Sequence, residues 1–150
     1  MKFSLLILAL LSAVFLSQSS SAQTPKKSRI VPADWLPALA PSIDTALEDL
    51  KEANSQSAMN TLSRHIADMT DAQLFIAYVR LYEKLTAKER TKLVEEQTAW
   101  LKKRPKVAEA GIESEGGSLA PLEANNAEVT YTEKRLAELR ARLKAVEKKK

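Results

Sequence analysis

Two groups of polar side chains are spaced so that they could exchange hydrogen bonds inside a helical protein. Gln97, Trp100 and Arg104 occupy positions i, i+3 and i+7, which share one face of a helix. Thr132 and Arg135, at i and i+3, form a second group. An arginine among apolar neighbours needs partners for its N–H donors, so hydrogen bonds across a helix–helix contact are expected. We refer to these five residues as the polar seam.

Two interpretations of the polar seam follow from the sequence. Polar groups in an apolar contact can fix the register of two packed helices. That structural role is favoured, because apolar residues surround every member. Binding of a ligand by the same side chains is the alternative.

The sequence offers few parts of a catalytic or metal site. It has no cysteine, one histidine and three glycines, and neither an HExxH motif nor a glycine-rich phosphate loop. The neighbours Glu95 and Glu96 would point about 100° apart on a helix and could not act on one atom together. His65 borders an apolar face and is predicted to be a surface or boundary residue. A non-catalytic protein without metal or cofactor is therefore expected.

Two long helices are predicted to position the polar seam. The first runs from Thr86 to about Ala110 and the second from Ser118 to Val146, with residues 111–117 between them. Each helix has an apolar stripe with a seven-residue repeat, which is typical of helices packed side by side. The stripes comprise Leu93, Trp100 and Val107, and Leu122, Val129, Leu136 and Leu143. This pattern predicts an antiparallel helical hairpin.

Further helices are predicted before the hairpin, at about 42–53, 56–68 and 70–85. Ser42 is suited to cap the first of them. Capping-box patterns at Thr70 and Thr86, each with Gln or Glu three residues later, predict helix starts at both. No segment has the alternation of a strand. The expected fold is all-α, a small bundle of four or five helices built around the hairpin.

The N-terminal residues read as a signal peptide. Lys2 precedes an apolar run from Leu5 to Leu16, and a run of small residues ends at Ala22. The run is shorter than the roughly 20 apolar residues that a spanning helix needs, so cleavage after Ala22 is favoured over an uncleaved membrane anchor. Export to a bacterial periplasm or the extracellular space is therefore expected, with no transmembrane segment after cleavage.

The rest of the chain divides into three parts by composition. Residues 23–41 contain four prolines and are predicted to be a linker. Residues 42–146 form the helical domain, and residues 147–150 form a basic tail. Pro105 is expected to kink the first hairpin helix, or to end its regular part near Arg104.

The net charge of +4 does not indicate a nucleic-acid-binding protein. Opposite charges alternate closely along the predicted helices, as they do on solvated faces. Binding to nucleic acid is therefore not expected. With no cysteine for disulfides, helix packing alone must hold the fold.

Several motifs in residues 81–143 resemble the LprI-type lysozyme-inhibitor-like family of small exported bacterial helical proteins. They are Gln-x-x-Trp-x-x-x-Arg at 97–104, Thr-x-x-Arg-x-x-x-Leu at 132–139, and the flanking runs 81–85 and 116–122. The chain departs from the family pattern at Pro105, where relatives often have an acid, and at Ala108 and Ala127, where they commonly have cysteines. The resemblance implies that relatives form a bridge there, and that the hairpin tip is looser in this chain.

The resemblance implies contact with a lysozyme or related glycosidase. The candidate partner-binding loop is the acidic turn Glu113, Ser114, Glu115, Gly116, Gly117 and Ser118. The mildly basic chain opposes attraction to a cationic lysozyme, whereas the turn itself favours it. A turn that only connects two helices is the alternative for this segment. The alternative for the protein is a structural module whose lysines at 102–103 and 148–150 contact an anionic envelope surface.

Overall fold

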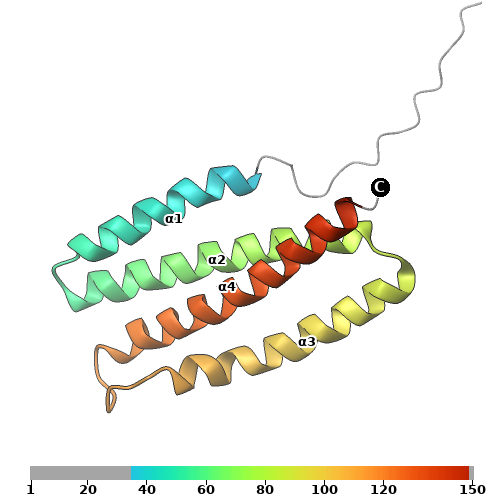
Figure 1. Ribbon diagram of the computed structural model, residues 1–150. Helices are drawn as coiled ribbons and strands as arrows, with labels where there is room; N and C mark the ends of the chain where they lie inside the picture. Colours follow the sequence, from blue (N-terminus) through green and yellow to red (C-terminus); the bar gives the residue numbers. More distant parts are fainter. Residues whose placement is uncertain (1–34, 149–150) are drawn as a thin grey trace, which may run out of the picture.

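The computed structural model describes residues 35–148, which form four helices and no strand. The helices are α1 (Trp35–Glu52), α2 (Gln56–Lys84), α3 (Ala87–Ala110) and α4 (Ala120–Glu147). The predicted all-α bundle is thereby confirmed (Figure 1). The predicted signal peptide, residues 23–34 of the linker and residues 149–150 of the tail lie outside the described residues.

α2 and α4 form the central pair of the four-helix bundle. Successive helices run in opposite directions, so α3 and α4 form the predicted antiparallel hairpin (Figure 1). α4 packs along α3, but more extensively along α2, and α1 packs on α2. The hairpin of α3 and α4 is therefore stabilised by packing against α2 as well as by the contact between its own two helices.

The main core lies where α2, α3 and α4 meet. Leu81, Leu93 and Leu139, one from each helix, are completely buried. The rest of this core comprises Leu74, Ala77, Leu85, Trp100 and Leu136. A smaller cluster of Ala46, Ile66 and Met69 attaches α1 to α2, with Val129 of α4 packed against it. Fully burying an aliphatic side chain contributes about 1.5–3 kcal/mol, so these residues hold the bundle together.

One predicted helix start is confirmed and another is wrong. The Thr86 hydroxyl accepts a hydrogen bond from the Glu89 amide, and the Glu89 carboxylate accepts one from the Thr86 amide at 2.9 Å. Thr70, in contrast, lies in the middle of α2, where its hydroxyl donates to the Ile66 carbonyl at 2.8 Å. A threonine hydroxyl can cap the start of a helix, but inside a helix it can also donate to the carbonyl four residues earlier. Apolar packing on both sides of Thr70 allows α2 to continue past this position.

The prolines interrupt the helices less than predicted. α1 begins at Trp35, seven residues before Ser42, and includes Pro37 and Pro41. Pro37 lies in the first turn, where an N–H group has no intrahelical partner to lose. α3 continues through the exposed Pro105 to Ala110. The predicted end of regular helix near Arg104 is therefore wrong.

None of the helices within residues 35–148 is long and apolar enough to cross a membrane.

Candidate functional site

Gln97, Trp100 and Arg135 of the polar seam lie at the contact between α3 and α4. Gln97 accepts a hydrogen bond from Nε of Arg135 at 3.1 Å, which joins the two arms. Arg135 also bonds Glu138 at 2.9 Å, and its Nη2 lies 3.7 Å from Glu96. Only 10% of the Arg135 side chain is exposed. The structure thus brings Gln97 and Arg135 together, as a register-fixing pair would require.

Glu96 forms ion pairs with two arginines of α4 and accepts a hydrogen bond from one of them, Arg142. Its carboxylate lies 2.5 Å from Arg142 Nη1 and 3.7 Å from Arg135 Nη2. Burial raises the pKa of Glu96, but the hydrogen bond from Arg142 and the positive charges of Arg142, Arg135 and Lys92 outweigh it, and the pKa remains below its ordinary value. Glu96 is therefore ionised at neutral pH and holds α3 to α4.

Trp100 and Arg104 form the centre of the seam. The Trp100 ring stacks on Tyr131 of α4, with centroids 5.0 Å apart and planes 4° apart. The Arg104 guanidinium lies 5.5 Å from the Trp100 ring centroid and forms an ion pair with Asp71 of α2. Trp100 is 9% exposed, so its ring is enclosed between the two arms.

A partly buried polar network continues from the seam toward the start of α4. Glu128 lies 3.7 Å from Arg104 and accepts a hydrogen bond from Arg64 of α2 at 3.2 Å. Asn125 donates to the Ser63 hydroxyl at 2.9 Å, and both are buried. This network joins α2, α3 and α4 through charged, amide and hydroxyl side chains.

Sequence reasoning placed some members of this network and missed others. Arg104 and Asn125 stand out in the sequence as polar residues on apolar stripes, and both take part in the network. Thr132, predicted for the seam, is buried at 1% exposure. Asp71, Arg64 and Glu128 were missed. For Glu128 a signal existed, because Asn125, Glu128 and Thr132 have the i, i+3, i+7 spacing of one helix face.

The acidic turn between α3 and α4 is held at its base. A single oxygen of Glu123 in α4 accepts hydrogen bonds from the Glu113 amide (3.1 Å), the Ser114 amide (3.0 Å) and the Ser114 hydroxyl (2.7 Å). The Ser118 carbonyl accepts a bond from Asn60 of α2 at 2.9 Å. The turn lacks the cysteine bridge implied for relatives, yet it is bonded to two helices.

The tip of the turn projects from the bundle. Glu113, Glu115, Gly116, Gly117 and Ser118 are exposed. Gly116 and Gly117 have φ angles of 96° and 94°, a conformation that side-chain-bearing residues rarely adopt. The two glycines therefore allow the chain to reverse in a short distance and to keep both acidic side chains in solvent.

The hydrogen bonds to Glu123 make the turn sensitive to acid. They hold the pKa of Glu123 below its ordinary value, the Ser114 hydroxyl contributing most. A carboxylate with a lowered folded-state pKa stabilises the turn above its ordinary pKa, and this contribution is lost as pH falls through the lowered value. We expect the Ser114 amide resonance to shift in that acidic range and its hydrogen exchange to accelerate.

The matched variants for this prediction are Glu123→Gln and Glu115→Gln. Glu123→Gln should abolish the acidic transition of the Ser114 amide and speed its exchange at neutral pH. Glu115→Gln, at an exposed residue of the same turn, should leave both unchanged. A transition that survives in Glu123→Gln would contradict the assignment.

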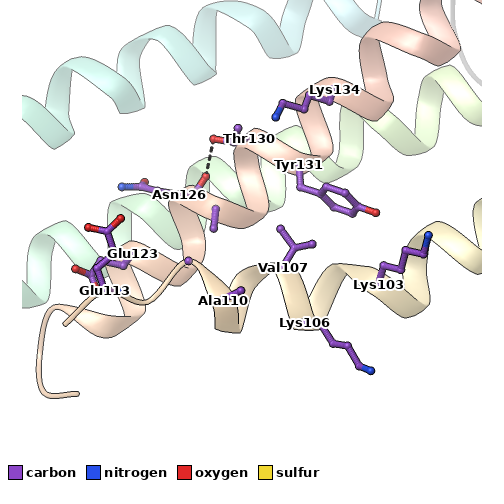
Figure 2. A pocket seen from close by; sticks show the side chains of 12 residues that line it. Lys103, Lys106, Val107, Ala110, Glu113, Glu123, Asn126, Thr130, Tyr131 and Lys134 are labelled. Atoms are coloured by element: carbon purple, nitrogen blue, oxygen red, sulfur yellow. Dashed lines mark hydrogen bonds between the residues drawn. The ribbon is translucent and has the colours of Figure 1, made fainter. Parts of the chain in front are cut away.

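A groove of about 810 Å³ lies beside the turn, between the end of α3 and the start of α4 (Figure 2). Val107, Ala110, Ala127 and Tyr131 line it with apolar surface. Lysines of both helices line the end away from the turn, and Glu113 and Glu123 line the end at the turn. The turn and this groove form one continuous surface at the end of the hairpin.

Comparison with known proteins gives one match. The family model described as "Lysozyme inhibitor LprI" matches residues 48–139, more than half of the chain. The match begins before the motifs noted in the sequence and includes all of α2. Searches of curated proteins and of solved structures gave no significant match. The matched region contains the seam, the turn and the groove, and the chain belongs to the LprI family.

Proposed function

We propose that the protein is an exported, non-catalytic inhibitor that binds a lysozyme or related glycosidase through the turn at residues 113–118. The observation that carries this proposal is the attachment of the turn by Glu123, which presents two acidic side chains on a preformed support. Family membership supports the class of partner. The contact surface is inferred from the geometry of the turn.

A preformed turn favours binding because less conformational entropy is lost when it meets a partner. Ordering a flexible loop costs free energy that must be taken from the contacts it forms. Here Glu113 and Ser114 are already bonded to α4, and Ser118 is bonded to α2. The tip can therefore enter a cleft without first becoming ordered.

Charge supports a basic partner locally, although the whole chain carries +4. Glu113 and Glu115 are exposed within three residues of each other, with no basic residue between Gly111 and Ser118. Interactions between exposed charges are screened over about 8 Å at physiological ionic strength, so the nearest charges dominate at contact. An acidic tip therefore suits a cationic enzyme surface despite the basic background.

Inhibition by charge-reversed variants tests this proposal. The protein without residues 1–22 should inhibit at least one member of a panel of lysozymes in a cell-wall turbidity assay. Reversing both turn acids, with Glu113→Lys and Glu115→Lys, should weaken inhibition about tenfold or more. The control reverses two exposed acids elsewhere, Glu52→Lys and Glu147→Lys, and makes the same change in net charge. An equal loss of inhibition in the two double variants would refute the assignment of the turn as the contact surface. The absence of inhibition by the parent protein would refute it as well.

A further inference from the structure

The groove between α3 and α4 has a shape suited to a small ligand. Its volume of about 810 Å³ lies in the range of ligand sites, which is roughly 300–1,000 Å³. The floor is hollowed because Ala110, Gly111 and Ala127 are small. A Cβ atom at Gly111 would lie 2.3 Å from the Ala127 Cβ, so α3 and α4 approach closely beneath it. Tyr131 and Val107 add a larger apolar surface toward the other end.

The end away from the turn is positively charged. Lys103 and Lys106 of α3 and Lys134 of α4 line the groove, and none of them forms an ion pair with a residue of the described part of the chain. Lys106 points outward from α3, Lys103 lies beside the Tyr131 ring, and Lys134 runs back along α4 toward Thr130 (Figure 2). Lys103 and Lys134 are exposed and line this end from α3 and α4, so an anionic group beside Tyr131 would meet positive charge from both helices.

The end at the turn is negatively charged. Glu123 is already engaged by three hydrogen bonds from the turn. The carboxylate of Glu113 is exposed and forms no ion pair within residues 35–148. The groove thus carries opposite charges at its two ends, with an apolar floor between them.

The distance between the charged ends sets the length of a matching ligand. Seven residues of α3 separate Lys103 from Ala110, a rise of about 10 Å, and Glu113 lies a few residues farther along the groove. An extended peptide covers about 3.3 Å per residue, so about four residues span the groove. Their side chains would alternate between the floor and solvent.

We propose that this groove binds an extended peptide of about four residues, with its free amino terminus at Glu113 and its terminal carboxylate at Lys103 and Lys134. An acyl chain with a carboxylate would leave Glu113 unpartnered. A polyanion would place negative charge against Glu113 and Glu123, and like charges in contact disfavour binding. The bipolar arrangement therefore selects a zwitterionic peptide over either of them.

Trp100 supplies a direct readout of binding. The Tyr131 ring that lines the groove stacks on Trp100, so a ligand above Tyr131 changes the surroundings of the indole. Trp35 is the other tryptophan of the chain, and Trp35→Phe leaves Trp100 as the single emitter. Titration of that variant with the free tetrapeptide Ala-Leu-Ala-Ala should give a saturable change in fluorescence.

Blocked peptides test both charged ends. Acetylation of the amino terminus and amidation of the carboxyl terminus should each weaken binding about tenfold, the effect expected when one ion pair is removed. Binding should also weaken as salt rises. Equal affinities for the free and the doubly blocked peptide would overturn the proposal, as would the absence of a saturable change at millimolar peptide.

Matched lysine variants locate the site. The double variant Lys103→Gln, Lys134→Gln should bind the free peptide about tenfold or more weakly than the parent protein. It should bind the free and amidated peptides with nearly equal affinity, because the lysines that pair with the terminal carboxylate are gone. The control, Lys102→Gln with Lys144→Gln, removes two exposed lysines outside the groove and should change nothing. Equal weakening in both pairs would overturn the proposal. A Trp100 fluorescence response to inorganic phosphate or to anionic phospholipid vesicles that matches the response to the peptide would also overturn the proposal. None of these measurements depends on inhibition of a lysozyme.

Discussion

Trp100→Ala is expected to lower the free energy of unfolding by about 3–5 kcal/mol, the range for removing a large aromatic side chain from a core. Three contacts are lost together: the stack on Tyr131, the position beneath Arg104, and the packing in the main core. The cavity would open where α3 and α4 approach each other, so collapse around it is limited. Urea denaturation followed by circular dichroism at 222 nm measures the loss.

Two control variants separate the role of Trp100 from a general effect of changing α3. Trp100→Phe keeps an aromatic ring and should cost clearly less than Trp100→Ala. Leu101→Ala removes an adjacent side chain that is 46% exposed, and should change stability by less than about 1 kcal/mol. Similar losses in Trp100→Ala and Leu101→Ala would contradict the enclosed position of the indole.

Glu128→Gln is expected to destabilise the protein by about 2–3 kcal/mol. Removing one partner of a buried ion pair costs about 3–5 kcal/mol, and this value is reduced here because the surroundings are partly open to solvent. The Glu128 and Arg104 side chains are 16% and 24% exposed, and that of Arg64 is 46% exposed. The change leaves Arg104 with Asp71 as its remaining ion-pair partner, and leaves Arg64 bonded to α4 only through the side-chain carbonyl oxygen of Asn125 at 3.5 Å.

A double-mutant cycle with Arg104→Gln measures this interaction directly. The coupling energy between Glu128 and Arg104 should exceed that between Glu128 and Arg64, since the Arg104 side chain is less exposed. Glu138→Gln is the control, because Glu138 pairs with Arg135 but is 61% exposed, and its loss should cost less than about 1 kcal/mol. A cost for Glu128→Gln no larger than that for Glu138→Gln would show that the network contributes little.

The sequence predicted the hairpin because its signal is local and repeated. Seven-residue spacing placed Leu93, Trp100 and Leu136 on facing stripes, and all three are buried. The same spacing could not show that α4 packs mainly on α2. Partners such as Ser63 and Asn125 are 62 residues apart, and no local pattern connects them. The helix start predicted at Thr70 was wrong for a related reason. α2 continues through Thr70 because Ile66 and Met69 beside it are held by tertiary contacts, which no local pattern reveals.

The candidate site was predictable in composition but not in geometry. The acidity of residues 113–118 and the glycines of the turn are visible in the sequence. The attachment is not, because the acceptor, Glu123, lies nine residues from Ser114 and resembles any other acid in the first turn of a helix. Likewise, the groove needs the small residues of α3 and α4 to face each other, which depends on the register of the two helices.

The attached turn also bears on how two copies of the chain could exchange helices. Domain swapping would require residues 111–119 to straighten, so that α4 leaves its own α2 and packs on that of a second molecule. Straightening would break the bonds from Glu113 and Ser114 to Glu123 and release Ser118 from Asn60. The bonds that hold the turn therefore add to the free-energy cost of such an exchange.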